Sequence, residues 1–135
     1  MSILKKIALG IVILILVLVV IEVVNASKYK MKVNVVDGEN VMGINPMTES
    51  LDFGDLSRNN GMRRFITLNN GGRFANYILV WKFGEISDLV KVDKKVFVLG
   101  SGEEVQLTFD INIPPSAETK KYSGRVWIFR IPKLF

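Results

Sequence analysis

The side chains that most often carry out chemistry in proteins are scarce in this sequence. It contains neither histidine nor cysteine, which excludes the usual zinc sites and the common pairs of a nucleophile with a base. Two pairs of carboxylates remain as candidates for acid–base catalysis, Glu103 with Glu104 and Asp52 with Asp55. A pair serves that role only when its element turns both side chains toward one reacting group.

The predicted elements do not support catalysis by either pair. Glu103 and Glu104 precede a predicted strand, where successive side chains point to opposite faces. Asp52 and Asp55 can offer oxygen ligands to a cation, but solvated loop acids are the favoured interpretation. Gly100-Ser101-Gly102 is not followed by a helix pattern, which a phosphate-binding loop requires. We therefore predict no catalytic, cofactor-binding or metal-binding residues, and expect that the protein is not an enzyme.

A long apolar segment near the start places the chain at a membrane. Residues 7–24 contain one charge, Glu22, and a helix of that length spans about 27 Å, close to the ~30 Å hydrocarbon thickness of a bilayer. Leu, Ile and Val occupy every face, which excludes an amphipathic helix lying on the surface. Glu22 falls in the last turn, where it reaches the headgroups, so a solvated acid is favoured over an ion path.

Two interpretations of this segment stay open. An uncleaved anchor comprises residues 7–26 and follows a basic flank at residues 1–6. A cleaved secretory signal would end after Ala26, but the apolar run exceeds the usual signal core of about 7–15 residues, which favours the anchor. Lysines flank the segment on both sides, and a long domain translocates largely regardless of charge. We therefore expect a single-pass protein of the cell membrane whose domain lies outside the cytoplasm.

The domain expected at residues 27–135 is mildly basic. The chain has a net charge of +5, and residues 1–26 contribute +1 of it, which leaves +4 for the domain. Basic and acidic residues are interspersed, so nucleic-acid binding is disfavoured. Lys28, Lys30 and Lys32 can attract anionic headgroups, and plain solvation explains them equally well. Without cysteine, the redox compartment cannot be inferred from disulfides.

Beyond residue 27 the sequence reads as short β-strands separated by turns. Apolar and polar residues alternate in runs bounded by Gly, Asn, Pro and Asp. The clearest run is 104–113, whose apolar residues share one face, as in an antiparallel strand with one dry face. Residues 74–83 carry apolar side chains at both odd and even positions, that is, on both faces of a strand, which predicts a central strand covered on both sides. The other predicted strands are 29–36, 41–45, 51–53, 63–68, 96–99 and 125–131.

These elements predict an all-β domain of seven to eight short strands, arranged as a two-sheet antiparallel sandwich behind one N-terminal transmembrane helix. Gly54 after Phe53 predicts a stop, with the next strand resuming only at Arg63. The expected core consists of Leu51, Phe53, Ile66, Leu68, Leu79, Trp81, Phe109, Ile111 and either Trp127 or Ile128.

Five phrases, in order, resemble one known family. They are INPMTESLDFGDL (44–56), RRFITLNN (63–70), ILVWKF (78–83), VFVLGSGEEVQLTFDINIPP (96–115) and YSGRVWIF (122–129). Residues 44–129 are thereby similar to the immunoglobulin-like sandwich of the major sperm protein and ASPM-SPD2-Hydin type.

The resemblance carries expectations for individual residues. It implies that the Phe53-Gly54 kink takes the first edge strand from one sheet toward the other. It also implies that Asn70 caps a turn, that Trp81 is buried in mid-sandwich, and that Tyr122 bonds back to nearby backbone. Residues 29–36 precede the family pattern and are expected to add an edge strand or a stalk. Some members bind acidic peptides through a basic face, for which Arg63, Arg64 and Lys82 are candidates here, although no spacing requires it.

Two functions agree with these features. The first is a membrane-anchored, extracytoplasmic, non-catalytic module that binds or scaffolds another envelope protein through an edge or face of the sandwich. The alternative is a structural subunit of a surface filament or its membrane base, by analogy with archaeal motility and pilus machineries. The Ile-, Val- and Lys-rich composition is similar to that of archaeal proteins, but Glu22 comes too late for a pilin. Expected partners are lipid, through residues 7–26, and a protein or a second copy; no nucleic acid, small-molecule substrate or cofactor is expected.

Overall fold

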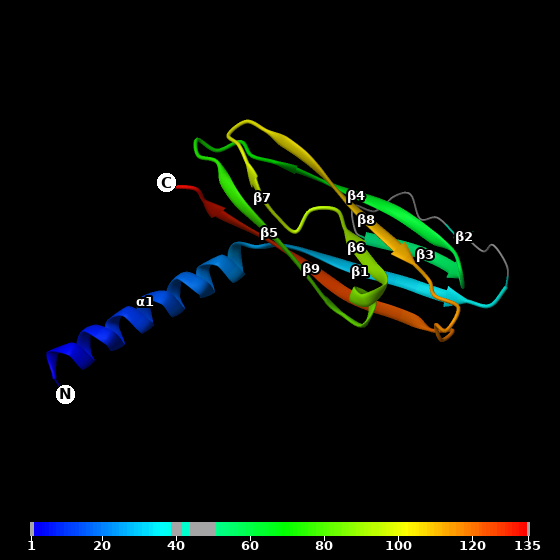
Figure 1. Ribbon diagram of the computed structural model, residues 1–135, viewed down its shortest axis with the longest axis horizontal. Helices are drawn as coiled ribbons and strands as arrows, with labels where there is room; N and C mark the ends of the chain where they lie inside the picture. Colours follow the sequence, from blue (N-terminus) through cyan, green and yellow to red (C-terminus); the bar gives the residue numbers. More distant parts are fainter. Residues whose placement is uncertain (1, 39–41, 44–50, 135) are drawn as a thin grey trace.

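The computed structural model describes residues 2–38, 42–43 and 51–134. The N-terminal part is one helix, α1 (Ile3–Asn25), which projects away from a β-domain (Figure 1). The hydroxyl of Ser2 caps the helix by accepting a hydrogen bond from the Lys5 N–H at 3.4 Å. Among the described residues, α1 alone is long and apolar enough to cross a membrane. Its side chains are exposed except in the last turn, where Glu22 and Val23 are half-buried.

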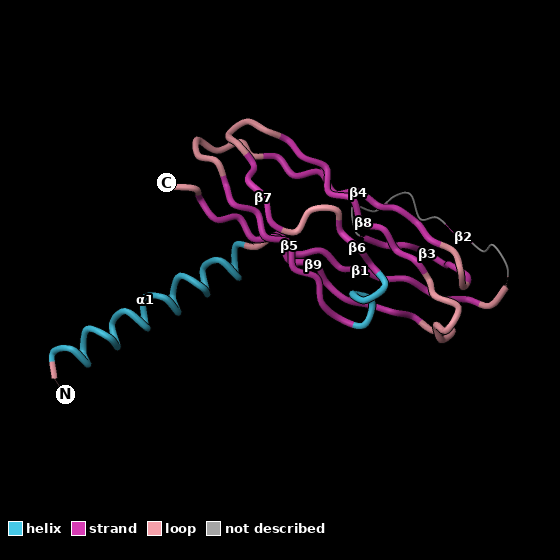
Figure 2. The backbone as a smooth tube through the Cα atoms, viewed as in Figure 1, coloured by secondary structure: helices cyan, strands magenta, loops and turns pink. Residues whose placement is uncertain are grey.

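The domain has two facing sheets, which confirms the predicted all-β sandwich. Within the described residues, sheet A has the order β2-β3-β1-β9-β5-β7 and sheet B the order β4-β8-β6. Figure 2 shows that strands dominate the domain, with the 3-10 helix η1 (Glu85–Leu89) between two of them. The strands are β1 (Ser27–Val36), β2 (Met42–Gly43), β3 (Leu51–Ser57), β4 (Gly61–Asn69), β5 (Asn76–Gly84), β6 (Val90–Val92), β7 (Val96–Leu99), β8 (Glu104–Asn112) and β9 (Lys121–Pro132).

The core fills the space between the two sheets. Strand β8 and the residue after it line one side of this core, as the sequence predicts. Their alternate apolar residues are at most 2% exposed: Leu107, Phe109, Ile111 and Ile113. Each such side chain stabilises the fold by about 1.5–3 kcal/mol relative to exposure. The opposite layer comes from alternate residues of β1, β3, β5 and β9. The largest fully buried side chains include Met31, Leu51, Phe53, Leu56, Leu68, Ile78, Leu107, Phe109, Ile111 and Ile113.

Strand β1 differs from the prediction for residues 29–36. It lies inside sheet A, between β3 and β9, and so is not an added edge strand. It pairs with β9 antiparallel and with β3 in parallel, so sheet A is mixed rather than purely antiparallel. Residues 37–50 between β1 and β3 provide the dozen or so residues that a parallel connection needs. Of the short strand predicted at 41–45, residues 42–43 form β2, and the others lie outside the described residues.

The predicted stop after Phe53 is wrong, because β3 continues through Gly54 to Ser57. Gly54 has a φ of 69°, and the pairing register with β1 shifts there, which is a β-bulge rather than a change of sheet. The Asp52 carboxylate accepts the Gly54 N–H at 2.9 Å and holds the bulge. The chain crosses from sheet A to sheet B after Ser57, through residues 58–60, where Asn59 has a φ of 65°.

Strand β5 is covered on one face, not on both. Its inward residues Ile78 and Val80 are buried, whereas Leu79 and Trp81, both predicted in the core, are 40% and 55% exposed. Sheet B covers only the inner side of sheet A, and the described residues contain no second sheet over the outer side. Between the two alternatives on β9, Ile128 is the fully buried residue.

Two predicted turn contacts are confirmed. Asn70 is buried, and its amide nitrogen lies 2.9 Å from the Phe74 carbonyl, 3.0 Å from that of Leu99 and 3.1 Å from that of Gly100. Its amide oxygen accepts the Gly72 N–H. The Tyr122 hydroxyl accepts the Glu118 N–H at 3.0 Å, four residues upstream. Asn70 therefore joins the β4–β5 connection to the β7–β8 turn.

The Asn70→Ala variant tests this junction. We expect a loss of about 3 kcal/mol, because buried polar groups left without a hydrogen bond cost about 1–3 kcal/mol each. The measurement is urea unfolding of the full chain in detergent, with tryptophan fluorescence as the signal. The matched control is Asn69→Ala, whose side chain is exposed and whose loss should change stability by less than about 0.5 kcal/mol. Equal effects of the two variants would contradict the role given to Asn70.

Candidate functional site

The structure does not bring Asp52 and Asp55 together. Asp52 is buried and forms an ion pair with Lys32 of the neighbouring β1, at 3.5 Å. Asp55 accepts a hydrogen bond from the Asn34 side chain at 3.0 Å. Each carboxylate is thus engaged by a different β1 residue on either side of the bulge. Among the described residues, no three metal-ligating side chains gather into a cluster.

The second carboxylate pair is also separated. The Glu103 carboxylate accepts the Gly100 N–H at 3.0 Å and closes the β7–β8 turn. Glu104 is the first residue of β8 and lies opposite Asn69. The two side chains therefore have different structural surroundings.

The three candidates for a basic face do not form one. Arg63 lies on β4 and binds Asp110 of β8, with its Nε 2.7 Å from a carboxylate oxygen. Arg64 donates from Nε to the Asp52 carbonyl at 3.0 Å. Lys82, on the other sheet, donates to the Ser87 carbonyl at 2.5 Å. These groups hold local structure on different sheets.

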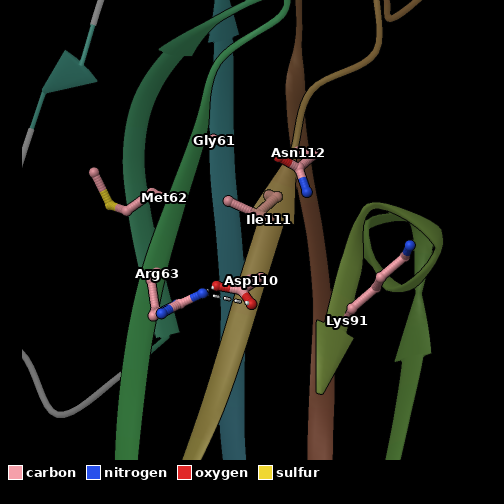
Figure 3. A pocket seen from close by; sticks show the side chains of 7 residues that line it. All are labelled: Gly61, Met62, Arg63, Lys91, Asp110, Ile111 and Asn112. Carbon is pink, nitrogen blue, oxygen red and sulfur yellow. Dashed lines mark hydrogen bonds and ion pairs between the residues drawn. The ribbon is translucent and has the colours of Figure 1, made fainter. Parts of the chain in front are cut away.

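An open hollow on the outer side of sheet B holds the Arg63–Asp110 pair (Figure 3). The hydrogen bond that Arg63 donates to the Asp110 carboxylate raises the pKa of Arg63, and the two opposite charges form an ion pair. Lys91 of β6 lies in register with Asp110, but its ammonium group points away from the pair (Figure 3). The remaining lining is backbone and short or apolar side chains.

The outer face of sheet A carries a cluster of aromatic rings, in which Trp81 is exposed, Phe83 and Trp127 are half-buried and Phe129 is buried. We call Trp81 and Phe83 of β5 with Trp127 and Phe129 of β9 the aromatic patch. The ring centroids of Trp81 and Trp127 are 6.3 Å apart, and those of Phe83 and Trp127 are 5.1 Å apart, both nearly perpendicular. Such edge-to-face pairs stabilise each other by about 0.5–1.5 kcal/mol. Trp81 nevertheless keeps 55% of its surface exposed.

Strand register explains why these rings meet. In the β5–β9 pairing, Trp81 lies opposite Trp127 and Leu79 opposite Phe129, so one parity of both strands points outward together. Strand β7 extends the apolar surface with Val96, which is 69% exposed and lies opposite Leu79. Contiguous exposed apolar surface of this kind marks interaction sites in soluble domains.

A row of basic side chains borders the aromatic patch. We call Lys28, Lys30 and Lys32 of β1 with Arg125 of β9 the basic row. The Lys28 ammonium lies 5.6 Å from the centre of the Trp127 ring, a cation–π contact that joins the two surfaces. Lys30 and Arg125 are directly opposite each other and exposed. Within the described part of the chain neither forms an ion pair, and like charges in that position are destabilising.

The sequence contains the signal for this surface, of which sequence reasoning picked out only the lysines, as a contact for headgroups. Aromatic residues recur at a spacing of two in 81 and 83 and again in 127 and 129, and lysines do so in 28, 30 and 32. A spacing of two places the members of each set on one face of a strand. The spacing alone does not show whether that face of the strand is buried against the second sheet or exposed.

Comparisons with known proteins find no matching family model, no matching curated protein and no matching solved structure. The resemblance to the major sperm protein type therefore stays a prediction. The candidate site rests on the geometry of the outer face of sheet A.

A pair of substitutions in β5 tests whether the aromatic patch is a free surface. We expect Trp81→Ala to cost only about 1 kcal/mol of folding free energy, the worth of its ring contacts. Ile78→Ala, three residues away on the buried face, should cost about 2–5 kcal/mol because it opens a cavity. Urea unfolding of both variants measures the difference. A loss at Trp81 as large as that at Ile78 would assign Trp81 to fold stability instead.

Proposed function

We propose that this protein is a single-pass membrane protein whose β-sandwich lies outside the cytoplasm and binds another envelope protein, without catalysing a reaction. The helix α1 acts as the anchor and the outer face of sheet A as the binding surface. The observation that carries the proposal is the aromatic patch beside the basic row. Exposed aromatic and basic side chains, tryptophan and arginine above all, are the usual anchors of protein interfaces.

The chemistry of this surface defines the partner. The aromatic patch favours a partner that presents apolar side chains, since burial of the exposed Trp81 ring and of the uncovered parts of Phe83 and Trp127 supplies the non-polar contribution to binding. The Lys30–Arg125 pair favours acidic side chains next to them, because an acid placed between the two cations relieves their repulsion. We therefore expect an interface in which apolar residues and Asp or Glu residues lie side by side.

A second copy of this chain is the alternative partner, as in a filament or its base. A two-fold contact between two copies of the same face would set basic row against basic row or force it to the rim. The charge pattern therefore disfavours self-association through this face alone. A head-to-tail contact, with the patch of one copy on a different surface of the next, is the arrangement a filament requires.

Introduced cysteines test the orientation, because the chain has none of its own. We expect Ser116→Cys, in the exposed connection between β8 and β9, to react with a membrane-impermeant maleimide on intact cells. Ser2→Cys, at the other end of α1, should react only after lysis. The reverse pattern would place the domain in the cytoplasm and contradict the proposed location.

Site-specific photo-cross-linking tests the binding surface in native cells. We expect a benzoylphenylalanine at position 81 to form an adduct with another envelope protein. The matched control is position 65, an exposed phenylalanine on the outer side of sheet B, which should give none. Lys30→Glu together with Arg125→Glu should reduce the yield at position 81, because the acidic partner is repelled.

The other outcomes separate the alternatives. An adduct of the chain with itself at position 81 would favour the filament subunit. Equal yields at positions 81 and 65, or no adduct at either, would contradict binding through the outer face of sheet A.

A further inference from the structure

We propose that the end of the sandwich next to α1 is seated on an anionic lipid surface. This end comprises Phe74, Tyr77, Ile131 and Leu134, together with the basic residues Arg73 and Lys133, and we call it the proximal end. The inference rests on the anchoring role of α1 in the proposed function, but not on the partner of the aromatic patch.

The connection between the helix and the sandwich leaves almost no slack. The helix ends at Asn25, β1 begins at Ser27, and Ala26 alone separates them. One residue of extended chain spans at most about 3.6 Å. A helix of 23 residues is about 34 Å long, slightly more than the ~30 Å hydrocarbon core. The first residues of β1 must therefore lie within the headgroup layer or directly above it.

Strand pairing then brings the proximal end down to the same level. Ser27, the first residue of β1, is paired with Ile128, yet β9 continues to Pro132. These further residues run back past the start of β1, on the side where the helix leaves, by about 13 Å of strand. The C-terminus and the β4–β5 and β7–β8 connections lie at this same end (Figure 1).

The side chains at the proximal end suit a lipid interface. Phe74 and Leu134 are 59% and 68% exposed, so most of their apolar surface is not covered by the fold. Tyr77 lies opposite Ile131 across β5 and β9, and the Lys133 ammonium is 5.9 Å from the centre of the Tyr77 ring. Aromatic rings with basic neighbours are typical of the layer where a membrane protein meets the headgroups.

Charge favours an anionic surface over a neutral one. Arg73 and Lys133 form no ion pair within the described residues. The acids at this end, Glu103 and Glu104, belong to the start of sheet B, and Glu103 is engaged by the Gly100 N–H. Each Lys or Arg near an anionic membrane favours the docked state by about fivefold.

Fluorescent labels in the full chain, reconstituted in vesicles, test the proposal. The reporter is a single NBD-labelled cysteine at Gly71, where an added Cβ meets nothing within 4 Å. The control reporter is at Ser116, in the connection between β8 and β9, and this connection lies at the opposite end of the sandwich (Figure 1). In vesicles of phosphatidylcholine with phosphatidylglycerol, doxyl groups near the headgroups should quench the label at 71 and leave the label at 116 unaffected. In phosphatidylcholine alone, quenching at 71 should weaken.

Two double variants separate the apolar and charged contributions. Phe74→Asp with Leu134→Asp should abolish quenching at 71, whereas the matched control Phe65→Asp, on sheet B, should not change it. Arg73→Glu with Lys133→Glu should reduce the ratio of docked to undocked domain by about 25-fold or more in anionic vesicles. Tryptophan emission reports whether each variant remains folded.

The outcomes distinguish this proposal from the one on which it rests. A chain that floats with the vesicles, but shows equal quenching at 71 and 116 or none at 71, overturns the lipid contact and leaves the anchor intact. Failure to float with the vesicles overturns both. If the proximal end binds a protein instead, protein-free vesicles give no quenching at 71, which also overturns the lipid contact. Cross-linking at position 81 is decided independently.

Discussion

The antiparallel pairing of β1 with β9 fixes the positions of the helix, both faces of sheet A and the proximal end. The ladder starts at Ser27 opposite Ile128 and continues to Asn34 opposite Lys121, so the segment that leaves the helix is at once a central strand. A linker of several residues would let the domain tumble above its anchor. Here the short connection and the β1–β9 pairing fix the position of sheet A relative to the end of α1. Each outward side chain of β1, β5 and β9 therefore lies at a defined distance from the end of the helix.

The same pairing makes the two faces of sheet A unequal. Sheet B covers the inner face and excludes water from it, whereas the outer face is apolar over β5, β7 and the second half of β9 but has no second layer among the described residues. Apolar surface left in water forgoes about 25 cal/mol for each Å² that burial would remove. The ring contacts of Trp81 explain only part of the choice of tryptophan at position 81, since more than half of its surface is left in water. The proposed binding function accounts for the exposed part of the ring, and it accounts in the same way for the repulsion between Lys30 and Arg125.

The sequence predicts a strand well where its alternation of apolar and polar residues matches one buried face and one exposed face. In β8 and the residue after it, alternate apolar residues from Leu107 to Ile113 form one buried face, and the turn role of Asn70 agrees with what the family resemblance implies. In β5, apolar residues on both faces of the strand predict that both faces are buried. The sequence pattern cannot distinguish a buried apolar face from an apolar face that is exposed. Gly54 permits either a turn or a bulge, and only pairing with β1 decides. Arg63, Arg64 and Lys82 are separated by sheet membership, which local spacing does not encode.

The two proposed surfaces reinforce each other because of where they lie along the strands. Trp81 is four residues farther along β5 than Tyr77, about 13 Å of strand, so the aromatic patch begins just above the proximal end. A domain seated on lipid through Phe74 and Leu134 cannot turn freely, and its aromatic patch is then presented at a fixed height. A partner that is anchored in the same membrane diffuses only in the membrane plane. It therefore loses less translational and rotational freedom when it binds this patch. Part of the entropic cost of association would thereby be met in advance, so the proposed interface would need fewer contacts than one between two freely diffusing proteins.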